Sequence, residues 1–353
     1  MAKNKWLSQL NSYDDTVNFE SDPKAKENCL FSPSPSFNWI FACPGGGFPK
    51  GTGLLFSAEP KAGKSLMCQA IISQLHTDDP EAICLYWNTE LRGGYQQSFF
   101  DGIDPDRLVM YDSNLPEDLF DRLTKDIFPL IEEGMPVKMI VIDSLTNIAG
   151  RRGKNCESVM DLTPGDRAQT KQAGLERIIP FCKKHKITLL STEQKRSNMD
   201  MGNPHAPKTK STATWYTKHA YEYFIEIRKE TAKDQRTDLL GKSFTDDSIK
   251  SMKSGDGDVT GHRISFKMEA SSLGTPNRQG ILTIDYKKGI INKEEEIFEL
   301  GKNTGVIAFK MPRSYSYGER KWSSKEDILT AIRDDKELYN SILEGIIARD
   351  ADK

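Results

Sequence analysis

The stretch GLLFSAEPKAGKSLMCQAIISQL, residues 53–75, decides the fold. An apolar run at 54–58 leads into a loop that contains glycine and lysine, and a helix-forming segment follows. The loop AEPKAGKS departs from the phosphate-binding pattern G-x-x-x-x-G-K-[S/T] only at its first position, where Ala58 replaces glycine. A chance match is the alternative, but strand, loop and helix in this order are the setting that a phosphate-binding loop requires. We therefore predict a P-loop.

The residue types of this loop suit a nucleotide and Mg²⁺. Gly63 lets the backbone wrap phosphates, Lys64 would reach the β- and γ-phosphates in a catalytic role, and the Ser65 hydroxyl would hold Mg²⁺. Alanine is tolerated at position 58 if that residue has a negative φ. The predicted cofactors are ATP and Mg²⁺. The predicted nucleotide-binding residues of the loop are Ala58, Glu59, Pro60, Lys61, Ala62, Gly63, Lys64, Ser65 and Leu66.

Outward from the loop, short apolar runs alternate with helix-length segments. The runs lie at 54–58, 82–87, 108–111, 139–143 and 187–192, and the helical segments at 64–75, 117–133 and 167–185. This pattern predicts an α/β fold with a mainly parallel sheet and helices on both faces. Later runs at 221–228, 263–269 and 280–286 alternate apolar and polar residues, which predicts antiparallel strands that extend the sheet. Pro180 is expected to end or kink its helix near Ile179.

Two of the strands deliver carboxylates to their carboxyl ends. Asp143 follows the apolar run 139–142 and would hold Mg²⁺ beside the P-loop if the two strands are adjacent; capping of the next helix is the alternative. Glu90 follows the run 82–87 and would orient the attacking water as a catalytic residue, with helix capping again the alternative.

The order of these motifs resembles the RecA family of recombinases, most closely the phage-type UvsX proteins, from about residue 33 to 290. The resemblance implies that Gln194, at the end of its strand, senses the γ-phosphate and reports it to a DNA-binding loop. As a bare residue it could equally be a solvated loop amide. Tyr95 is a candidate to stack on the adenine, although a core or surface tyrosine fits as well.

The same resemblance implies two DNA-binding loops, at about 150–163 and 195–214. The net charge of the chain, with 49 basic and 51 acidic residues, is −2, which excludes a uniformly basic surface but not a local basic groove. Residues 183–218 carry eight lysines and arginines against two acidic residues. Such groups hold phosphates without reading bases, although a solvated charge cluster is the alternative. The predicted DNA-binding residues are Arg151, Arg152, Lys154, Lys195, Arg196, Lys208 and Lys210.

One segment departs from the family pattern. The family supplies two basic residues from the neighbouring subunit to the γ-phosphate, before a Pro-x-basic pattern. Here the corresponding positions are Ala270 and Ser272, followed by Pro276-Asn-Arg278. Lys267 or Arg278 could substitute, or the alignment could shift by a few residues. The departure bears on how efficiently ATP is turned over.

The resemblance implies a RecA-like ATPase core at 31–292, between a small N-terminal oligomerisation arm at 1–30 and a small C-terminal helical region at 293–353. The expected function is ATP-dependent strand exchange: a helical filament on single-stranded DNA, with nucleotide at the subunit interfaces, pairs with homologous duplex in repair and recombination-dependent replication. A single-strand-binding protein and a mediator are further candidate partners. The alternatives are a RecA-like accessory protein with little ATP turnover and a RecA-fold helicase motor.

The cysteine pattern bears on metal content and compartment. The six cysteines are scattered, with no CxxC pair, so a structural metal is not expected. Because the chain also lacks an apolar run long enough for a membrane span, we expect a cytoplasmic protein, in a bacterial host if it is phage-encoded.

Overall fold

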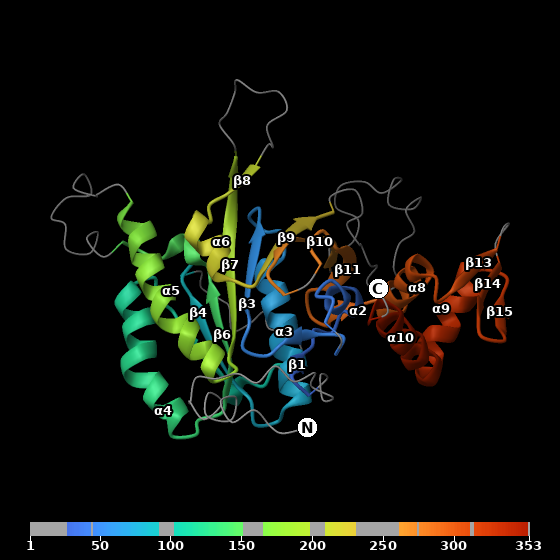
Figure 1. The fold of residues 1–353 in the computed structure, drawn as a ribbon, viewed down its shortest axis with the longest axis horizontal. Coiled ribbons are helices and arrows are strands. Elements are labelled where there is room, and N and C mark those ends of the chain that lie inside the picture. Colours follow the sequence, from blue (N-terminus) through green and yellow to red (C-terminus); the bar gives the residue numbers. More distant parts are fainter. Residues whose placement is uncertain are drawn as a thin grey trace, which may run out of the picture.

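A ten-stranded mixed sheet forms the centre of the fold (Figure 1). It is seen in a computed structural model that describes residues 27–43, 45–91, 102–150, 165–197, 209–230, 261–273, 275–310 and 314–351. The strand order is β12-β11-β10-β9-β3-β7-β6-β4-β5, and β8 pairs with β7 outside this path. The strands are β3 (Gly53–Ala58), β4 (Ile83–Asn88), β5 (Leu108–Tyr111), β6 (Val137–Asp143), β7 (Thr188–Ser197), β8 (Thr209–Ser211), β9 (Tyr223–Lys229), β10 (Gly261–Ser271), β11 (Gln279–Asp285) and β12 (Gly289–Ile291).

The pairing pattern confirms a mainly parallel sheet with an antiparallel extension. All neighbours from β5 to β9 are parallel, and β9, β10, β11 and β12 pair antiparallel. Strand β9, predicted as antiparallel, pairs antiparallel with β10 but parallel with β3, where Tyr223 is opposite Leu54. The chain returns from β7 through helix α6 (Trp215–Ala220) before entering β9, and a crossover of this kind joins parallel strands.

Alternate residues of β3 enter two separate apolar layers, so helices cover both faces. Leu54 and Phe56 belong to the layer that contains α2 (Pro35–Trp39) and α3 (Lys64–Asp78). Leu55 belongs to the other layer, with the helical segment 117–132 and α5 (Asp166–Lys184). Figure 1 shows α4 (Phe128–Glu132) and α5 on one side of the sheet and α3 on the other.

Pro180 does not end its helix. Helix α5 continues through Pro180 to Lys184, four residues beyond it. Proline removes one backbone donor, but packing can hold such a helix together. The buried residues Ile178 and Cys182 flank Pro180 and lie in the apolar layer against the sheet.

The C-terminal region combines helices with a small sheet. It contains α8 (Lys293–Thr304), the strands β13 (Ala308–Lys310), β14 (Ser314–Tyr317) and β15 (Arg320–Trp322), then α9 (Lys325–Asp334) and α10 (Lys336–Ala351). The predicted helices are present, and the three strands were not predicted, because strands of three or four residues leave too short an alternation to recognise. No helix in the described part of the chain is long and apolar enough to cross a membrane.

Candidate nucleotide and nucleic-acid site

The P-loop lies between β3 and α3. Ala58 is the last residue of extended β3 and has no positive φ, so alanine imposes no backbone cost where the pattern has glycine. Gly63, by contrast, has a φ of 101° at the N-terminus of α3, and a Cβ there would collide with Ile264. The structure thus requires glycine at the second glycine position of the pattern and not at the first.

Lys64 is buried and turned back over its own loop. Its Nζ donates to the backbone carbonyl oxygens of Ala58, at 3.3 Å, and Glu59, at 3.1 Å. The ammonium group therefore lies where the loop curves, which is the position from which a P-loop lysine reaches phosphate oxygens.

Asp143 is buried at the carboxyl end of β6 and accepts three hydroxyl donors. Its Oδ2 lies 2.5 Å from Ser65 Oγ and 2.7 Å from Tyr86 Oη, and its Oδ1 lies 2.5 Å from Thr192 Oγ1. The sequence placed Asp143 beside the P-loop on the condition that β3 and β6 are adjacent. They are not adjacent, because β7 lies between them. The carboxylate reaches Ser65 nevertheless, and helix α3 contacts β6 and β7 as well as β3.

The pair formed by Ser65 and Asp143 fits Mg²⁺. Among the described residues there is no group of three or more histidine, cysteine or acidic side chains that could hold a metal on its own. Mg²⁺ does not need one, since it is usually bound by one or two protein oxygens together with waters and substrate phosphates. The Ser65 hydroxyl, at the helical end of the phosphate loop, and the Asp143 carboxylate provide such oxygens.

Glu90 and Gln194, predicted separately, contact each other. Gln194 Nε2 donates to Glu90 Oε1 at 2.6 Å. Glu90 is held at this place by Thr89, which exchanges backbone and hydroxyl hydrogen bonds with Asp143 and Ser144 at 2.6–2.9 Å. A hydrogen bond therefore joins Glu90, which was predicted to orient water, to Gln194, which was predicted to sense the γ-phosphate.

Two threonines attach the backbone of Gln194 to both predicted DNA-binding loops. Its N–H donates to Thr146 Oγ1 at 3.0 Å, and its carbonyl oxygen accepts from Thr212 Oγ1 at 2.8 Å. The two hydroxyls lie 3.2 Å apart. Thr146 precedes the first loop and Thr212 belongs to the end of the second. Neither threonine was predicted from the sequence, because an isolated threonine carries no signal of its own.

A buried ion pair lies beneath this network. Glu193 Oε1 is 3.4 Å from Lys171 Nζ on α5, and Glu193 Oε2 accepts from Thr212 at 3.2 Å. Burial raises the pKa of Glu193, although Lys171 and Thr212 favour the carboxylate. Helix α5, strand β7 and the end of the second loop are thereby joined through one carboxylate. This pair was not predicted from the sequence either.

The second predicted loop begins as a β-hairpin, so Lys195 and Arg196 lie in a strand and not in a loop. Residues 195–197 of β7 pair with 209–211 of β8, and Arg196 is opposite Lys210. This hairpin projects beyond the rest of the sheet (Figure 1). Arg196 is exposed. The predicted residues Tyr95, Arg151, Arg152, Lys154 and Lys208 lie outside the described residues.

Lys195 differs from Arg196 in its surroundings. Its side chain is only 12% exposed, and its Nζ lies 2.5 Å from Glu226 Oε1, which also accepts from Arg228 at 2.6 Å. Burial opposes ionisation of Glu226, but the hydrogen bonds from Arg228 and Lys195 outweigh it and lower its pKa. The charge of Lys195 is therefore compensated within the chain.

Of the two candidate substitutes for the missing basic residues, Arg278 is engaged within the chain. It makes a bidentate ion pair with Asp350, at 2.6 and 2.8 Å, and its guanidinium lies 4.5 Å from the ring centroid of Trp39. Lys267 is partly exposed and lies 3.1 Å from Glu269. Ala270 and Ser272 lie at the end of β10 and just after it.

Similarity to known proteins extends over most of the chain. The RecA protein of Mesomycoplasma hyopneumoniae (strain 7448) is 24% identical over 312 residues, which cover 86% of this chain and 81% of that protein. The RecA protein of Mesoplasma florum is 22% identical over 278 residues (78% and 73%), and that of Staphylococcus aureus (strain JH9) is 21% identical over 300 residues (84% and 77%). These similarities support a relationship to the RecA family. No family model matches the chain.

The RecA relationship and the observed topology agree on the fold. The large mixed sheet, its mainly parallel half, and the helices on both faces make a RecA-like core. In this RecA-like core the P-loop, Glu90, Asp143 and Gln194 meet at one edge of the sheet, beyond the carboxyl ends of parallel strands. Open α/β sheets bind their ligands at this edge.

Proposed function

We propose that this chain is a DNA-dependent ATPase of the RecA type that assembles as a filament on single-stranded DNA and promotes strand exchange. The hydrogen bond between Gln194 and Glu90 carries the proposal, because it joins a hydrolytic residue to the strand that leads into a basic hairpin. The RecA relatives support the same interpretation. The closer assignment to phage-type UvsX proteins rests on the sequence resemblance alone.

In this proposal the phosphates of ATP lie on the backbone N–H groups of 59–65, with Lys64 directed at the β- and γ-phosphates. Ser65 and Asp143 would hold Mg²⁺, which neutralises phosphate charge when bound. Glu90 accepts a hydrogen bond from the attacking water and orients it. The resulting charge stabilisation and positioning account for most of the catalysis in phosphoryl transfer.

Gln194 connects hydrolysis with DNA binding. A γ-phosphate competes with Glu90 for the Gln194 amide, so the side chain adopts one position with ATP and another after hydrolysis. Because the backbone of Gln194 is tied to Thr146 and Thr212, each position favours a different arrangement of the two loop bases. ATP would thereby raise affinity for single-stranded DNA and hydrolysis would lower it.

The first prediction tests Glu90. Glu90→Gln should retain nucleotide binding and lose about 10²-fold or more in ATP turnover, because a neutral amide replaces the carboxylate that orients the attacking water and can take up its proton. Binding of a fluorescent ATP analogue and release of phosphate, with and without single-stranded DNA, measure the two properties. Glu81→Gln, at an exposed turn before β4, is the control. Unchanged turnover in Glu90→Gln would contradict the assignment.

One observation favours an accessory protein as the second candidate. Arg278 is occupied by Asp350, and the positions that would supply trans-acting charge hold Ala270 and Ser272. Electron microscopy beside the ATPase assay separates the candidates. Filaments with DNA-stimulated turnover indicate a recombinase, binding without turnover indicates an accessory protein, and rings indicate a helicase motor.

A further inference from the structure

Two thiols lie in contact near the start of the described chain. Cys29 Sγ and Cys43 Sγ are 3.3 Å apart. Cys29 belongs to β1 (Cys29–Leu30), which pairs with β2 (Phe48–Pro49), and Cys43 lies between α2 and β2. The other described cysteines, Cys68, Cys84 and Cys182, are buried, and burial raises the pKa of each of their thiols.

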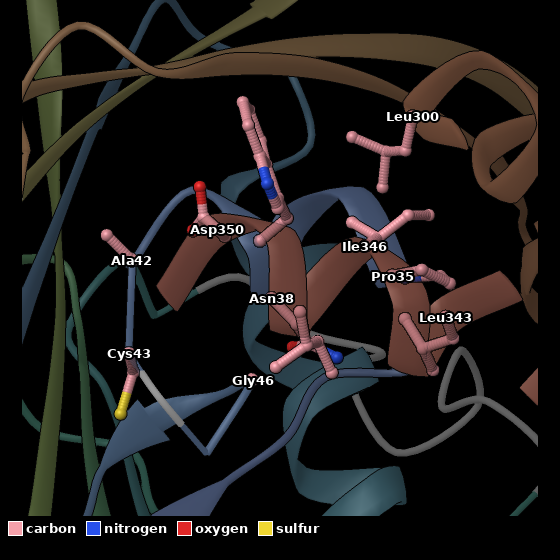
Figure 2. A pocket seen from close by; sticks show the side chains of 11 residues that line it. Pro35, Asn38, Ala42, Cys43, Gly46, Leu300, Leu343, Ile346 and Asp350 are labelled. Atoms are coloured by element: carbon pink, nitrogen blue, oxygen red, sulfur yellow. The ribbon is translucent and has the colours of Figure 1, made fainter. Parts of the chain in front are cut away.

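The two thiols differ in environment. Cys29 is buried, whereas Cys43 is partly exposed and lies at one side of a cavity bounded by α2 and α10 (Figure 2). The hydrogen bond with Cys29 lowers the pKa of Cys43, and the backbone N–H of Gly45 acts in the same direction. Burial acts against these two hydrogen bonds, but the net effect lowers the pKa of Cys43, so the less buried of the two cysteines is also the one whose thiolate is stabilised, which favours reactivity.

We propose that Cys29 and Cys43 are a redox pair, in which a peroxide oxidises Cys43 and Cys29 closes a disulfide with it. The Cys43 thiolate attacks one peroxide oxygen: an S–O bond forms, the O–O bond breaks, and the departing hydroxide takes up a proton to become water. The Cys29 sulfur then attacks the sulfenic acid at Cys43: the S–S bond forms, the S–O bond breaks, and a second water leaves. Two thiols and one hydrogen peroxide give one disulfide and two waters, so two electrons pass from sulfur to oxygen.

The geometry allows this closure with small movements. The sulfurs must approach from 3.3 Å to about 2.05 Å, which side-chain rotation can supply. A disulfide of this kind in a reducing compartment is transient, and a dithiol reductant reverses it. Cys29 and Cys43 precede β3 in the chain, whereas the P-loop follows β3 at its other end, and no P-loop residue takes part in the redox steps. The proposal therefore does not depend on the proposed ATPase function.

The sequence provides a direct assay. Trypsin cleaves after Lys26 and Lys50, so residues 27–50 form one peptide that contains both cysteines and no others. The full-length reduced protein is treated with stoichiometric hydrogen peroxide, alkylated in denaturant, and digested. The expected product is peptide 27–50 that has lost two hydrogens and carries no alkyl group, and dithiothreitol should reverse the change. Cys68 and Cys84 should remain alkylated.

Variants assign the two roles. In Cys29→Ser the reaction should stop at a sulfenic acid on Cys43, trapped by dimedone, whereas in Cys43→Ser Cys29 should remain a thiol at the same dose. Cys29→Ala serves if the serine variant does not fold. In concentrated urea, which unfolds the protein, Cys29 and Cys43 should be oxidised no faster than Cys68. The proposal is overturned if the cysteines of peptide 27–50 oxidise no faster than Cys68 in the folded protein, or if they do not become linked.

Discussion

The Gln194 side-chain amide donates a hydrogen bond to Glu90, and in the proposed mechanism it also binds the γ-phosphate. In the proposed mechanism the Gln194 amide turns from Glu90 Oε1, 2.6 Å away, toward the γ-phosphate. Its backbone, in contrast, is held at both its N–H and its carbonyl by threonines. If the side chain moves as proposed, these two hydrogen bonds would pass the change to the residues at the bases of the two loops.

Thr212 provides the test of this coupling. Thr212→Val keeps the shape of the side chain but removes the hydroxyl that bonds Gln194, Glu193 and Thr146. Loss of one such bond costs about 1 kcal/mol, so stimulation of ATP turnover by single-stranded DNA should fall about five- to tenfold, while turnover without DNA stays within about twofold. Steady-state phosphate release measures both.

Thr212→Ser retains the hydroxyl and is the matched control, so its DNA stimulation should remain close to that of the wild type. An equal loss in the valine and serine variants would show that the methyl packing, and not the hydroxyl, matters.

The residues that the sequence could predict at this site are those that strands deliver to a sheet edge. Glu90, Asp143 and Gln194 each follow an apolar run, and parallel strands bring such positions together whatever their separation in the chain. Lys171 and Thr212 follow no such run. Their roles depend on which helix and which loop lie against β7, and a single sequence does not contain that pairing.

At the scale of elements, the extension of β7 beyond the sheet changes how the basic segment is understood. Residues 195–197 continue the strand, so alternate side chains point to opposite faces: Lys195 turns inward to Glu226, and the next residue, Arg196, is exposed. The sequence alone suggested a loop, because glycine, proline and polar residues at 198–208 hide the short return strand β8.

The hairpin predicts a specific salt dependence. Arg196 is exposed and is the register partner of Lys210, so the hairpin brings two basic residues together at the base of the second loop. Reversal of both, Arg196→Glu with Lys210→Glu, should weaken binding to single-stranded DNA. It should also lower the slope of log K against log salt by about 1.4, or about 0.7 for each phosphate that is no longer neutralised.

Fluorescence anisotropy with a labelled oligothymidine at several salt concentrations measures the slope. Lys125→Glu, an exposed lysine on the helical segment 117–132, should leave it unchanged. A slope equally altered by both changes would mean that overall charge, and not the hairpin, governs binding.

Helices α2 and α8 are joined by one buried carboxylate with a defined pH signature. Glu296 on α8 accepts hydrogen bonds from the hydroxyls of Ser34 and Ser36, and burial raises its pKa to about 7 against these bonds. Because the folded pKa lies above the ordinary 4.5, the native state holds this proton more tightly than the unfolded chain. The stability it contributes is present below pH 4.5 and is lost as the pH rises through about 7.

Between these two values the free energy of unfolding should fall by roughly 3 kcal/mol on account of this group. Glu296→Gln stays neutral and should lack this part of the fall, so its stability relative to the wild type should increase with pH. Urea titrations from about pH 4 to about pH 8 measure it. Glu344→Gln, which changes an exposed carboxylate on α10, should retain the wild-type dependence.

For the whole molecule, the C-terminal region was the least predictable part. The sequence predicted helices here, and helix α9 begins at a Ser324 cap whose side chain accepts from the backbone N–H of Asp327. The attachment of the region to the core depends on contacts between residues far apart in the chain: Glu296 with Ser34, and Arg278 with Asp350 and Trp39. Such pairs leave no trace in local periodicity.

Arg278 has two alternative roles: it holds α10 against the core, or it reaches the nucleotide of a neighbouring subunit. One pair of variants distinguishes them. If it holds α10 against the core, Arg278→Met should lower the free energy of unfolding by about 2 kcal/mol or more, because Asp350, whose side chain is 13% exposed, is left unpaired. Arg320→Met, which breaks the exposed pair with Asp335, should cost far less, because solvent screens that pair. If Arg278 instead reaches the nucleotide of a neighbouring subunit, Arg278→Met should lose ATP turnover with little change in stability. The structure predicts the first outcome, and replacement of both partners, Arg278→Met with Asp350→Leu, should then recover part of the lost stability.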